Sequence, residues 1–261
     1  MATALITGAS SGIGLALAKV FAKNGHDVIL VARSEDKLQA LKAELSKAHG
    51  IQATVFSHDL TERSAPQALF DQVQQNGLTV DVLVNNAGYG DYGEFAEGDW
   101  SKLEGMILLN MLATTHLSRL FLPAMIQRGS GQVLNVSSTA AFQPGPMMAV
   151  YFATKAYVLS FSEAIAAETS DQGINVTVLC PGPTQSDFID TANMRQAALL
   201  NKSAEDKLPT ADDVAQFGYD ALQSGQVVAV HGLANKLMTF STRLAPRSLI
   251  RKGVKQFMAS E

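Results

Sequence analysis

The feature that most constrains this chain is a regular alternation of short apolar runs with longer amphipathic segments. Most of the runs are continuously apolar, which is typical of strands covered on both faces, and the segments between them have helical periodicity. The predicted strands are Thr3–Thr7, Asp27–Ala32, Ala53–Ser57, Asp81–Asn85, Gly131–Ser137, Asn175–Cys180 and Val227–His231. The predicted helices are Gly12–Asn24, Glu35–Ala48, Glu62–Asn76, Trp100–Gln127, Ala149–Ser170 and Ala211–Ser224. This order predicts an α/β fold with a doubly wound parallel sheet, the Rossmann fold.

Local signals refine the boundaries of these elements. Ser34, followed by the acidic Glu35 and Asp36, predicts a helix N-cap, and Pro123 predicts a kink or restart within the long helix. Residues 183–209 lack strong periodicity and predict a long inserted loop of a kind that is usually functional or mobile. No linker, repeat or low-complexity tract divides the chain, so all 261 residues are assigned to one domain.

Composition excludes several classes of protein. Hydrophobic residues make up 47% of the chain and charged residues 17%, which excludes disorder, and the net charge of −4 gives no reason to expect nucleic acid. The only cysteine, Cys180, ends an apolar run and is interpreted as a core residue. Without a CxxC or HExxH pattern no metal site is expected. Without a signal peptide or an uninterrupted apolar run of about 18 residues, we expect a cytoplasmic protein with no spanning helix.

A glycine-rich turn, TGASSGIG at residues 7–14, joins the first predicted strand to the first helix. Glycines permit backbone angles and a close ligand approach that a Cβ would block. The N-terminus of the helix offers unpaired N–H groups and a positive dipole end to a pyrophosphate. The spacing is GxxxGxG rather than the GxGxxG of the general dinucleotide fingerprint. The turn predicts a phosphate site made of Gly8, Ser10, Ser11, Gly12, Ile13 and Gly14.

A tyrosine and a lysine four residues apart begin the helix predicted at 149–170. Tyr151 and Lys155 therefore share one helix face. An ammonium group beside a phenol favours the phenolate, so we expect Lys155 to lower the pKa of Tyr151 from about 10 and to make it a general acid or base. Ser138 lies at the carboxyl end of a strand, where doubly wound folds bind ligands, and its hydroxyl is expected to hold the substrate oxygen.

Four motifs in this order and spacing resemble the classical short-chain dehydrogenase/reductase family. They are TGASSGIG at 7–14, NNAG at 85–88, the serine pair at 137–138 and YFATK at 151–155. The resemblance extends from Ala2 to about Gly232. It implies an oxidoreductase that interconverts a carbonyl and an alcohol with a nicotinamide cofactor.

The resemblance also implies a role for individual residues. Ser138 would orient the carbonyl, Tyr151 would transfer the proton, and Lys155 would also bind the nicotinamide ribose. Asn110 matches the asparagine that supports a water and proton relay to the lysine. Ser137 could replace Ser138 on composition, but the spacing of thirteen positions from Ser138 to Tyr151 favours Ser138.

The remaining cofactor positions follow from the same resemblance. They are Asp59 and Leu60 beside the adenine; Asn86, Ala87 and Gly88 at the adenine ribose and the fourth-strand turn; and Pro181, Gly182, Thr184 and Ser186 beside the nicotinamide. The family often has an aliphatic residue in place of Thr184 and threonine in place of Ser186. These departures affect fine positioning only.

The end of the second predicted strand indicates which cofactor is used. Members of this fold that prefer NAD place a carboxylate there, which accepts hydrogen bonds from the ribose hydroxyls. Here Ala32 removes the carboxylate, while Arg33 and Ser34 offer a guanidinium and a hydroxyl to a 2′-phosphate. Ser11 replaces the other common NADP signal, a basic residue before the middle glycine of the loop. We therefore predict NADP(H), with Arg33 as the main determinant.

The predicted function is NADP(H)-dependent interconversion of a carbonyl and an alcohol on a small to medium, largely apolar substrate. The alternative is a non-catalytic protein that binds and senses NADP(H) on the same fold; the presence of Ser138, Tyr151 and Lys155 together favours the enzyme. The sequence leaves ketones, aldehydes, sterols and acyl thioesters open as substrates. The candidate pocket residues are Tyr89, Tyr92, Phe95, Ala140, Phe142, Met147, Met148 and Phe188.

Two further expectations concern partners. The family forms homodimers or homotetramers through its long helices, and the apolar face of Val158, Phe161, Ser162 and Ile165 offers either such a contact or core packing. Residues 232–260 hold six basic side chains and no acidic one, interspersed with apolar residues and divided by Pro246. Such a basic amphipathic extension fits cover of its own substrate cleft or sheet edge, a subunit contact, or an anionic membrane surface. We favour the first, because the apolar positions suffice for packing.

Overall fold

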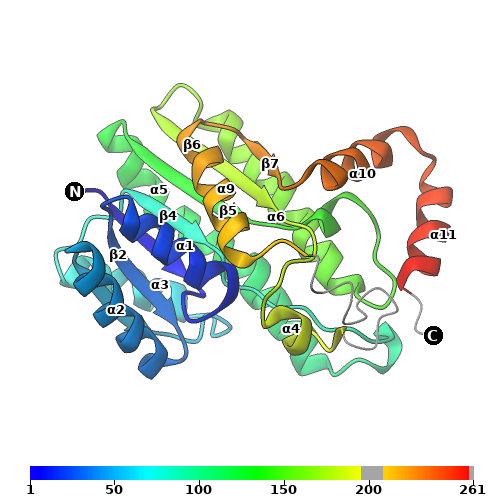
Figure 1. Ribbon diagram of the computed structural model, residues 1–261, viewed down its shortest axis with the longest axis horizontal. Coiled ribbons are helices and arrows are strands. Elements are labelled where there is room, and N and C mark those ends of the chain that lie inside the picture. The colour runs from blue at the N-terminus through cyan, green and yellow to red at the C-terminus, as the bar shows by residue number, and fades with distance from the viewer. Residues whose placement is uncertain (195–207, 259–261) are drawn as a thin grey trace.

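Seven parallel strands form one sheet in the order β3-β2-β1-β4-β5-β6-β7. The computed structural model describes residues 1–194 and 208–258 (Figure 1). The strands are β1 (Thr3–Thr7), β2 (Asp27–Ala32), β3 (Ala53–Ser57), β4 (Val82–Asn85), β5 (Gly131–Val136), β6 (Ile174–Cys180) and β7 (Val228–Val230). The strand order reverses between β1 and β4, so a crevice opens there at the carboxyl edge of the sheet. The predicted doubly wound parallel sheet is confirmed.

Helices cover both faces of the sheet, which explains the continuously apolar strands. In β1, Ala4 and Ile6 pack on one face against α1 (Gly12–Lys23), α2 (Glu35–His49) and α9 (Ala211–Gln223). Leu5 points to the opposite face, against α3 (Ala65–Gln75), α5 (Thr114–Arg128) and α6 (Ala149–Glu168). Side chains alternate along a strand, so burial on both faces requires apolar residues at successive positions.

The long helix predicted at 100–127 is interrupted, but not at the proline. It consists of α4 (Trp100–Ile107), a π-helical turn η2 (Leu108–Ala113) and α5, which continues through Pro123 to Arg128. The prediction that the helix restarts at Pro123 is wrong. The interruption instead surrounds Asn110, and π turns within helices are often found at functional sites.

The combined helix from Trp100 to Arg128 is long and apolar enough to span a membrane by length and composition alone. In the fold, however, Leu117, Phe121 and Met125 on α5 are buried against the sheet. This packing identifies it as a core helix of the α/β fold.

The face of α6 that was a candidate subunit contact packs within the chain itself. Val158, Ser162 and Ile165 are all buried, and Phe161 packs against the same core as Ile165. This face is therefore core, and the homodimer or homotetramer stays a prediction that requires another surface.

The C-terminal extension forms two helices beyond the last strand. α10 (Leu233–Leu244) extends to one side of the sheet, and α11 (Arg247–Met258) follows at a steep angle to it, at the right-hand edge of Figure 1. The loop predicted at 183–209 contains the short helix α7 (Phe188–Thr191), and its residues 195–207 lie outside the described part of the chain. Two short 3-10 turns, η1 (Phe95–Glu97) and η3 (Thr139–Phe142), complete the elements that surround the carboxyl edge.

Candidate active site

One large cavity of about 1240 Å³ lies at the carboxyl edge of the sheet. It runs from the end of β2, across the switch between β1 and β4, to the two C-terminal helices. Every residue proposed from the sequence to bind the cofactor lies on its wall, and so does Ser138. Asn110 is the one predicted site residue that does not line it. Residues from seven separate segments of the sequence thus meet at one continuous surface.

The glycine-rich turn forms the wall of this cavity at the N-terminus of α1. Gly8 has a φ of +69°, a backbone conformation that L side chains rarely adopt. A Cβ at Gly14 would lie 2.2 Å from the carbonyl oxygen of Gly8, so only glycine allows the helix to start this close to the strand. The side chain of the N-cap residue Ser11 makes no capping bond, and the first turn carries no acidic residue. The N–H groups of this turn are therefore open to an anionic group, as a pyrophosphate site requires.

Thr7 and Asn86 tie this turn to the end of β4. The Thr7 hydroxyl accepts hydrogen bonds from the backbone N–H groups of Asn86 and Ala87, both at 3.0 Å. The Asn86 amide in turn donates to the Thr7 carbonyl at 2.9 Å. The structure thus gives Asn86 a part in shaping the cavity wall. Thr7 was not singled out from the sequence, where it is the last residue of a predicted strand, yet its hydroxyl makes the other hydrogen bonds of this link between β1 and β4.

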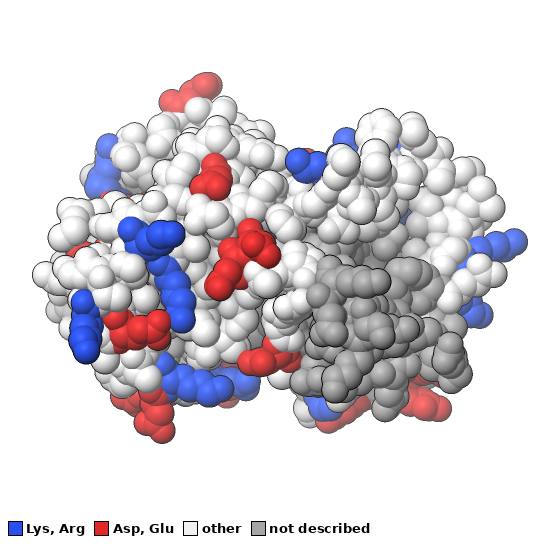
Figure 2. All heavy atoms as spheres, viewed as in Figure 1, with Lys and Arg blue, Asp and Glu red and all other residues white. Residues whose placement is uncertain are grey.

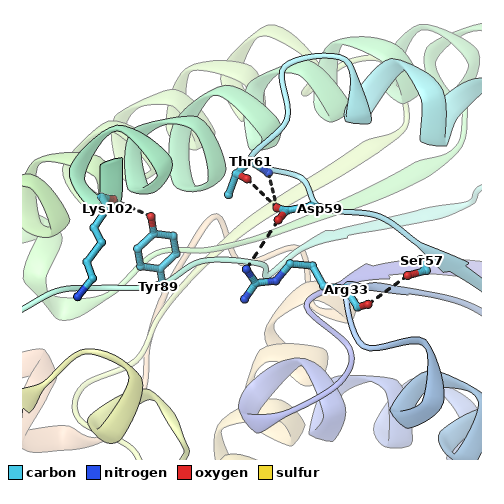
Figure 3. Close-up of polar contacts among 6 residues, drawn as sticks. All are labelled: Arg33, Ser57, Asp59, Thr61, Tyr89 and Lys102. Carbon is cyan, nitrogen blue, oxygen red and sulfur yellow. Dashed lines mark hydrogen bonds and ion pairs between the residues drawn. The ribbon is translucent and has the colours of Figure 1, made fainter. Parts of the chain in front are cut away.

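Arg33, drawn in Figure 3 beside Asp59, and Ser34 follow β2 and line the far end of the cavity. Arg33 is exposed, and its guanidinium lies 3.7 Å from the Asp59 carboxylate, which also accepts two hydrogen bonds from Thr61. Partial burial raises the pKa of Asp59, but the Thr61 bonds and the Arg33 charge lower it by more, and the net pKa is below its usual value. Ser34 occupies the predicted N-cap position of α2, yet its hydroxyl makes no capping bond. The Arg33 guanidinium and the Ser34 hydroxyl are therefore both available to a ligand at this end of the cavity.

Tyr89 and Lys102 border the same end of the cavity from the other side (Figure 3). The Tyr89 hydroxyl donates to the Lys102 carbonyl at 2.6 Å, which fixes the ring against α4. The Lys102 ammonium lies 3.9 Å from Asp91. Lys102 was not singled out from the sequence, because only the fold brings the start of α4 to the end of β2.

Ser138, Tyr151 and Lys155 meet in the middle of the cavity. Ser138 is the N-cap of η3, where its hydroxyl accepts a hydrogen bond from Ala140 N–H at 3.1 Å, and it also hydrogen bonds with Tyr151. The ammonium group of Lys155 donates to the Val136 carbonyl at 2.9 Å and lies 5.8 Å from the centre of the Tyr151 ring. Tyr151 and Lys155 are both buried.

The expected lowering of the tyrosine pKa is wrong for this arrangement. Burial raises the pKa of Tyr151 to about 12, and the hydrogen bond with Ser138 offsets only part of that effect. Burial also lowers the pKa of Lys155 to about 8. The physical reason is that an i, i+4 spacing places both side chains on one face, whereas desolvation of the two groups depends on the walls around them. Tyr151 is therefore a neutral phenol at pH 7, which is the protonated form that a proton donor requires.

Asn110 lies behind the cavity wall, inside the π turn. Its amide donates to the Tyr89 carbonyl and to the Thr154 hydroxyl, both at 3.0 Å, and accepts from Tyr89 N–H at 3.2 Å. Thr154 donates to the Tyr151 carbonyl at 2.8 Å. Asn110 thus links the segment after β4 to the first turn of α6. Among the described residues it makes no hydrogen bond to the Lys155 ammonium and does not line the cavity, although its amide oxygen and that ammonium both lie beside Gly88.

The other end of the cavity is largely apolar and is closed by the C-terminal helices. Its apolar side chains include Ala140, Met148, Phe152, Phe188, Met194, Met238, Ile250, Val254 and Met258. Of the described residues that line the whole cavity, the one arginine is Arg33, at the opposite end. The extension therefore covers its own cleft, the alternative that the sequence favoured.

Four of the eight candidate pocket residues line the cavity and four do not. Tyr89, Ala140, Met148 and Phe188 are on its wall. Phe95 is 64% exposed on η1, and Phe142 faces a separate small pocket beside β7. Tyr92 and Met147 pack behind the wall, where the Tyr92 hydroxyl donates to the Met258 carbonyl at 2.7 Å and holds the end of α11.

Comparison with known proteins agrees with this geometry. A sequence profile of the family described as short chain dehydrogenase matches residues 2–197. The chain belongs to the short-chain dehydrogenase family. Its fold also matches a solved short-chain dehydrogenase from Sphingobium yanoikuyae in complex with NADPH, with a TM-score of 0.83 and 30% identity over 100% of this chain and 99% of the other.

Two curated relatives are similar over a shorter stretch. The ketoacyl reductase HetN of Nostoc sp. is 37% identical over 69% of this chain and 62% of its own length. A very-long-chain 3-oxoacyl-CoA reductase of Anas platyrhynchos is 36% identical over 69% of this chain and 59% of its own length. This short-chain dehydrogenase thus spans about three-fifths of the length of these two relatives.

The chain's family is one of dehydrogenases, and the solved relative from Sphingobium yanoikuyae holds the nicotinamide cofactor NADPH. The geometry of the cavity, considered without the comparisons, also fits such a cofactor. The open N-terminus of α1 and the close approach at Gly14 suit a pyrophosphate, and the cavity continues from there both to Arg33 and to Tyr151.

Proposed function

We propose that this short-chain dehydrogenase is an NADPH-dependent reductase of a bulky, largely apolar carbonyl compound. One observation carries the proposal: a buried, neutral Tyr151, next to Ser138 and Lys155, faces the apolar end of a cavity whose opposite end presents Arg33. The Tyr151 phenol suits proton donation to a carbonyl oxygen, and the Arg33 guanidinium suits a 2′-phosphate.

Each of the three central residues has a distinct task in this proposal. The Ser138 hydroxyl holds the carbonyl oxygen, and Tyr151 donates its phenolic proton to that oxygen as the alcohol forms. The Lys155 ammonium stabilises the negative charge that then develops on the tyrosine, and it hydrogen bonds to the nicotinamide ribose. A bound reduced nicotinamide would supply the hydride to the carbonyl carbon. Asn110 acts through other residues, by holding Tyr89 and Thr154, and is a positioning residue.

The preference for NADPH follows from the groups after β2. Arg33 and Ser34 would bind the 2′-phosphate, and Ala32 leaves no carboxylate at the strand end to repel it. Asp59 is a negative charge beside Arg33, and the Arg33 guanidinium already neutralises part of that charge. The NADPH-bound relative from Sphingobium yanoikuyae supports this choice of cofactor.

The apolar end indicates the class of substrate. Its methionine and phenylalanine side chains suit a long or bulky hydrocarbon group, and no arginine among the described lining residues is placed there to bind a carboxylate or phosphate. One curated relative is named a ketoacyl reductase and the other a very-long-chain 3-oxoacyl-CoA reductase. A 3-oxoacyl thioester with a long acyl chain is therefore the first substrate to test, with bulky ketones alongside it.

The test follows NADPH oxidation at 340 nm with 3-oxoacyl-CoA thioesters of increasing chain length, bulky aryl ketones and, for comparison, acetone. We expect kcat/KM to increase with the apolar size of the substrate and turnover to be lost in Tyr151→Phe. NADPH binding without turnover of any of these compounds would instead favour the non-catalytic, NADP(H)-sensing alternative. A preference for acetone would refute the apolar substrate class.

A further inference from the structure

The outer face of α10 carries a largely exposed apolar stripe, of which Phe240 borders the small pocket beside β7. Leu233, Leu237, Phe240 and Leu244 follow one another at spacings of four, three and four residues and so lie on one helix face. Their exposed fractions are 75%, 63%, 57% and 74%. Leu249 on α11 is a further exposed apolar residue at 59%. A contiguous group of this kind marks an interaction surface, because isolated exposed leucines do not follow a helix stripe.

This stripe is separate from the apolar residues that close the cavity. The cavity is lined by Ala234, Met238, Ser241 and Thr242, which lie on another face of the same helix. The face toward the cavity mixes the apolar Ala234 and Met238 with the polar Ser241 and Thr242, whereas the outer stripe is wholly apolar and mostly exposed. Cover of the cleft does not account for the outer stripe.

The charges beside the stripe are all positive. Residues 232–260 contain Lys236, Arg243, Arg247, Arg251, Lys252 and Lys255 and no acidic residue. None of the ion pairs among the described residues includes any of them. In Figure 2 the charged side chains over α10 and α11, toward the right-hand edge, are blue, while red and blue side chains are mixed over the body to the left. The cationic charge is therefore free to meet an anionic surface.

We propose that α10 and α11 dock this protein on an anionic lipid surface. The stripe enters the interface between headgroups and acyl chains, and the basic residues of both helices contact lipid phosphates. The same helix would then separate the lipid from the cavity. This proposal does not depend on which carbonyl compound is reduced.

A second copy of the chain is a weaker occupant of the stripe. Pairing of α10 with α10 about a two-fold axis would bring two segments together that each carry six basic residues and no acid between 232 and 260. Such like charges repel each other across an interface. A membrane of anionic lipid satisfies the apolar stripe and the basic residues at once.

The test is co-sedimentation of the full chain with phosphatidylglycerol vesicles and, separately, with phosphatidylcholine vesicles at low salt. We expect binding to phosphatidylglycerol that decreases as salt is raised. Leu237→Ser combined with Phe240→Ser should weaken it more than tenfold. Arg251→Gln combined with Lys255→Gln should weaken it about 25-fold, since each basic residue near an anionic surface contributes about a fivefold factor.

Matched controls distinguish a specific effect of α10 and α11 from a general effect of surface substitutions. Phe95→Ser removes an apolar side chain that lies outside α10 and α11 and whose exposed fraction, 64%, is similar to those of Leu237 and Phe240. Lys37→Gln with Lys42→Gln removes two exposed charges from α2. Both controls should bind vesicles as the parent does, and all variants should keep the parent's thermal unfolding and NADPH binding, because the exchanged residues do not line the cavity.

Two results would overturn the proposal. One is a parent chain that stays in the supernatant with phosphatidylglycerol at low salt. The other is a dimer in sedimentation velocity that Leu237→Ser with Phe240→Ser converts to a monomer, with no vesicle binding; this would assign the stripe to a second copy. Loss of carbonyl reduction in every assay would leave the vesicle result unaffected, so the two proposals fail independently.

Discussion

Arg33→Ala is the sharpest test of the proposed cofactor preference. The guanidinium is exposed at the end of the cavity and is paired only with Asp59, at 3.7 Å. An exposed ion pair of this kind contributes at most about 1 kcal/mol to stability, so the variant should fold normally. A charge-assisted hydrogen bond to a phosphate is worth about 1.5–3 kcal/mol. We therefore expect kcat/KM with NADPH to fall roughly tenfold to 150-fold, since about 1.4 kcal/mol corresponds to a factor of ten.

The expected change is specific to one cofactor. NADH lacks the 2′-phosphate, so its kcat/KM should stay within about threefold of the parent value. Removal of Arg33 also leaves Asp59 without its positive partner, which adds repulsion toward the phosphate. Ser34→Ala should show the same selectivity with a smaller effect, because it removes a neutral hydrogen-bonding group.

The assay measures initial rates of both cofactors with one saturating carbonyl substrate, and direct binding of each cofactor by fluorescence. Lys37→Ala is the matched control, because it removes an exposed positive charge from the first turn of α2 without touching the cavity wall. Equal losses with NADPH and NADH, or an unchanged preference in Arg33→Ala, would show that Arg33 is not the determinant.

The remaining predictions concern catalysis and the cavity. Tyr151→Phe should lower kcat at least about 100-fold while the Kd for NADPH and the thermal unfolding change little; near-normal turnover would refute proton donation by Tyr151. Because the pKa of Lys155 is lowered to about 8, its ammonium is present below that pH and lost above it, so kcat/KM for reduction should decline as pH rises through about 8. Lys155→Arg should abolish that decline if it retains activity, because a guanidinium stays charged. Val254→Trp should reduce kcat/KM for bulky substrates more than for acetone, and an equal effect on both would contradict the assignment of this end of the cavity to the substrate.

The order of strands and helices could be predicted because burial on both faces of the sheet leaves a direct trace in the sequence. Leu5 and Ile6 point to opposite faces, yet both are fully buried and apolar. The positions lining the cavity at each strand end were predictable too, because parallel strands bring their carboxyl ends to one edge. The π turn around Asn110 left no such trace, since its residues are as apolar as those of the α-helix on either side.

What the sequence could not predict depends on surroundings rather than on residue type. The shift in the pKa of Tyr151 is set by walls that include the C-terminal helices, so a Tyr–Lys spacing gave the wrong sign. Phe95 and Phe142 are as apolar as Phe188, but the path of their turns directs them away from the cavity. Such positions are decided by tertiary packing, which a single sequence does not reveal.

The polar residues behind the cavity explain why its separate segments meet. Thr7 and Asn86 join the ends of β1 and β4, and Asn110 joins the continuation of β4 at Tyr89 to Thr154 on α6. A polar group buried without a partner is costly, so each of these side chains specifies the arrangement that satisfies it. The phosphate turn, the floor of the cavity and the helix that carries Tyr151 are thereby linked in one hydrogen-bonded series. The proton donor is held at a fixed position relative to the turn that would bind the pyrophosphate, and this fixed relation is what directed proton and hydride transfer require.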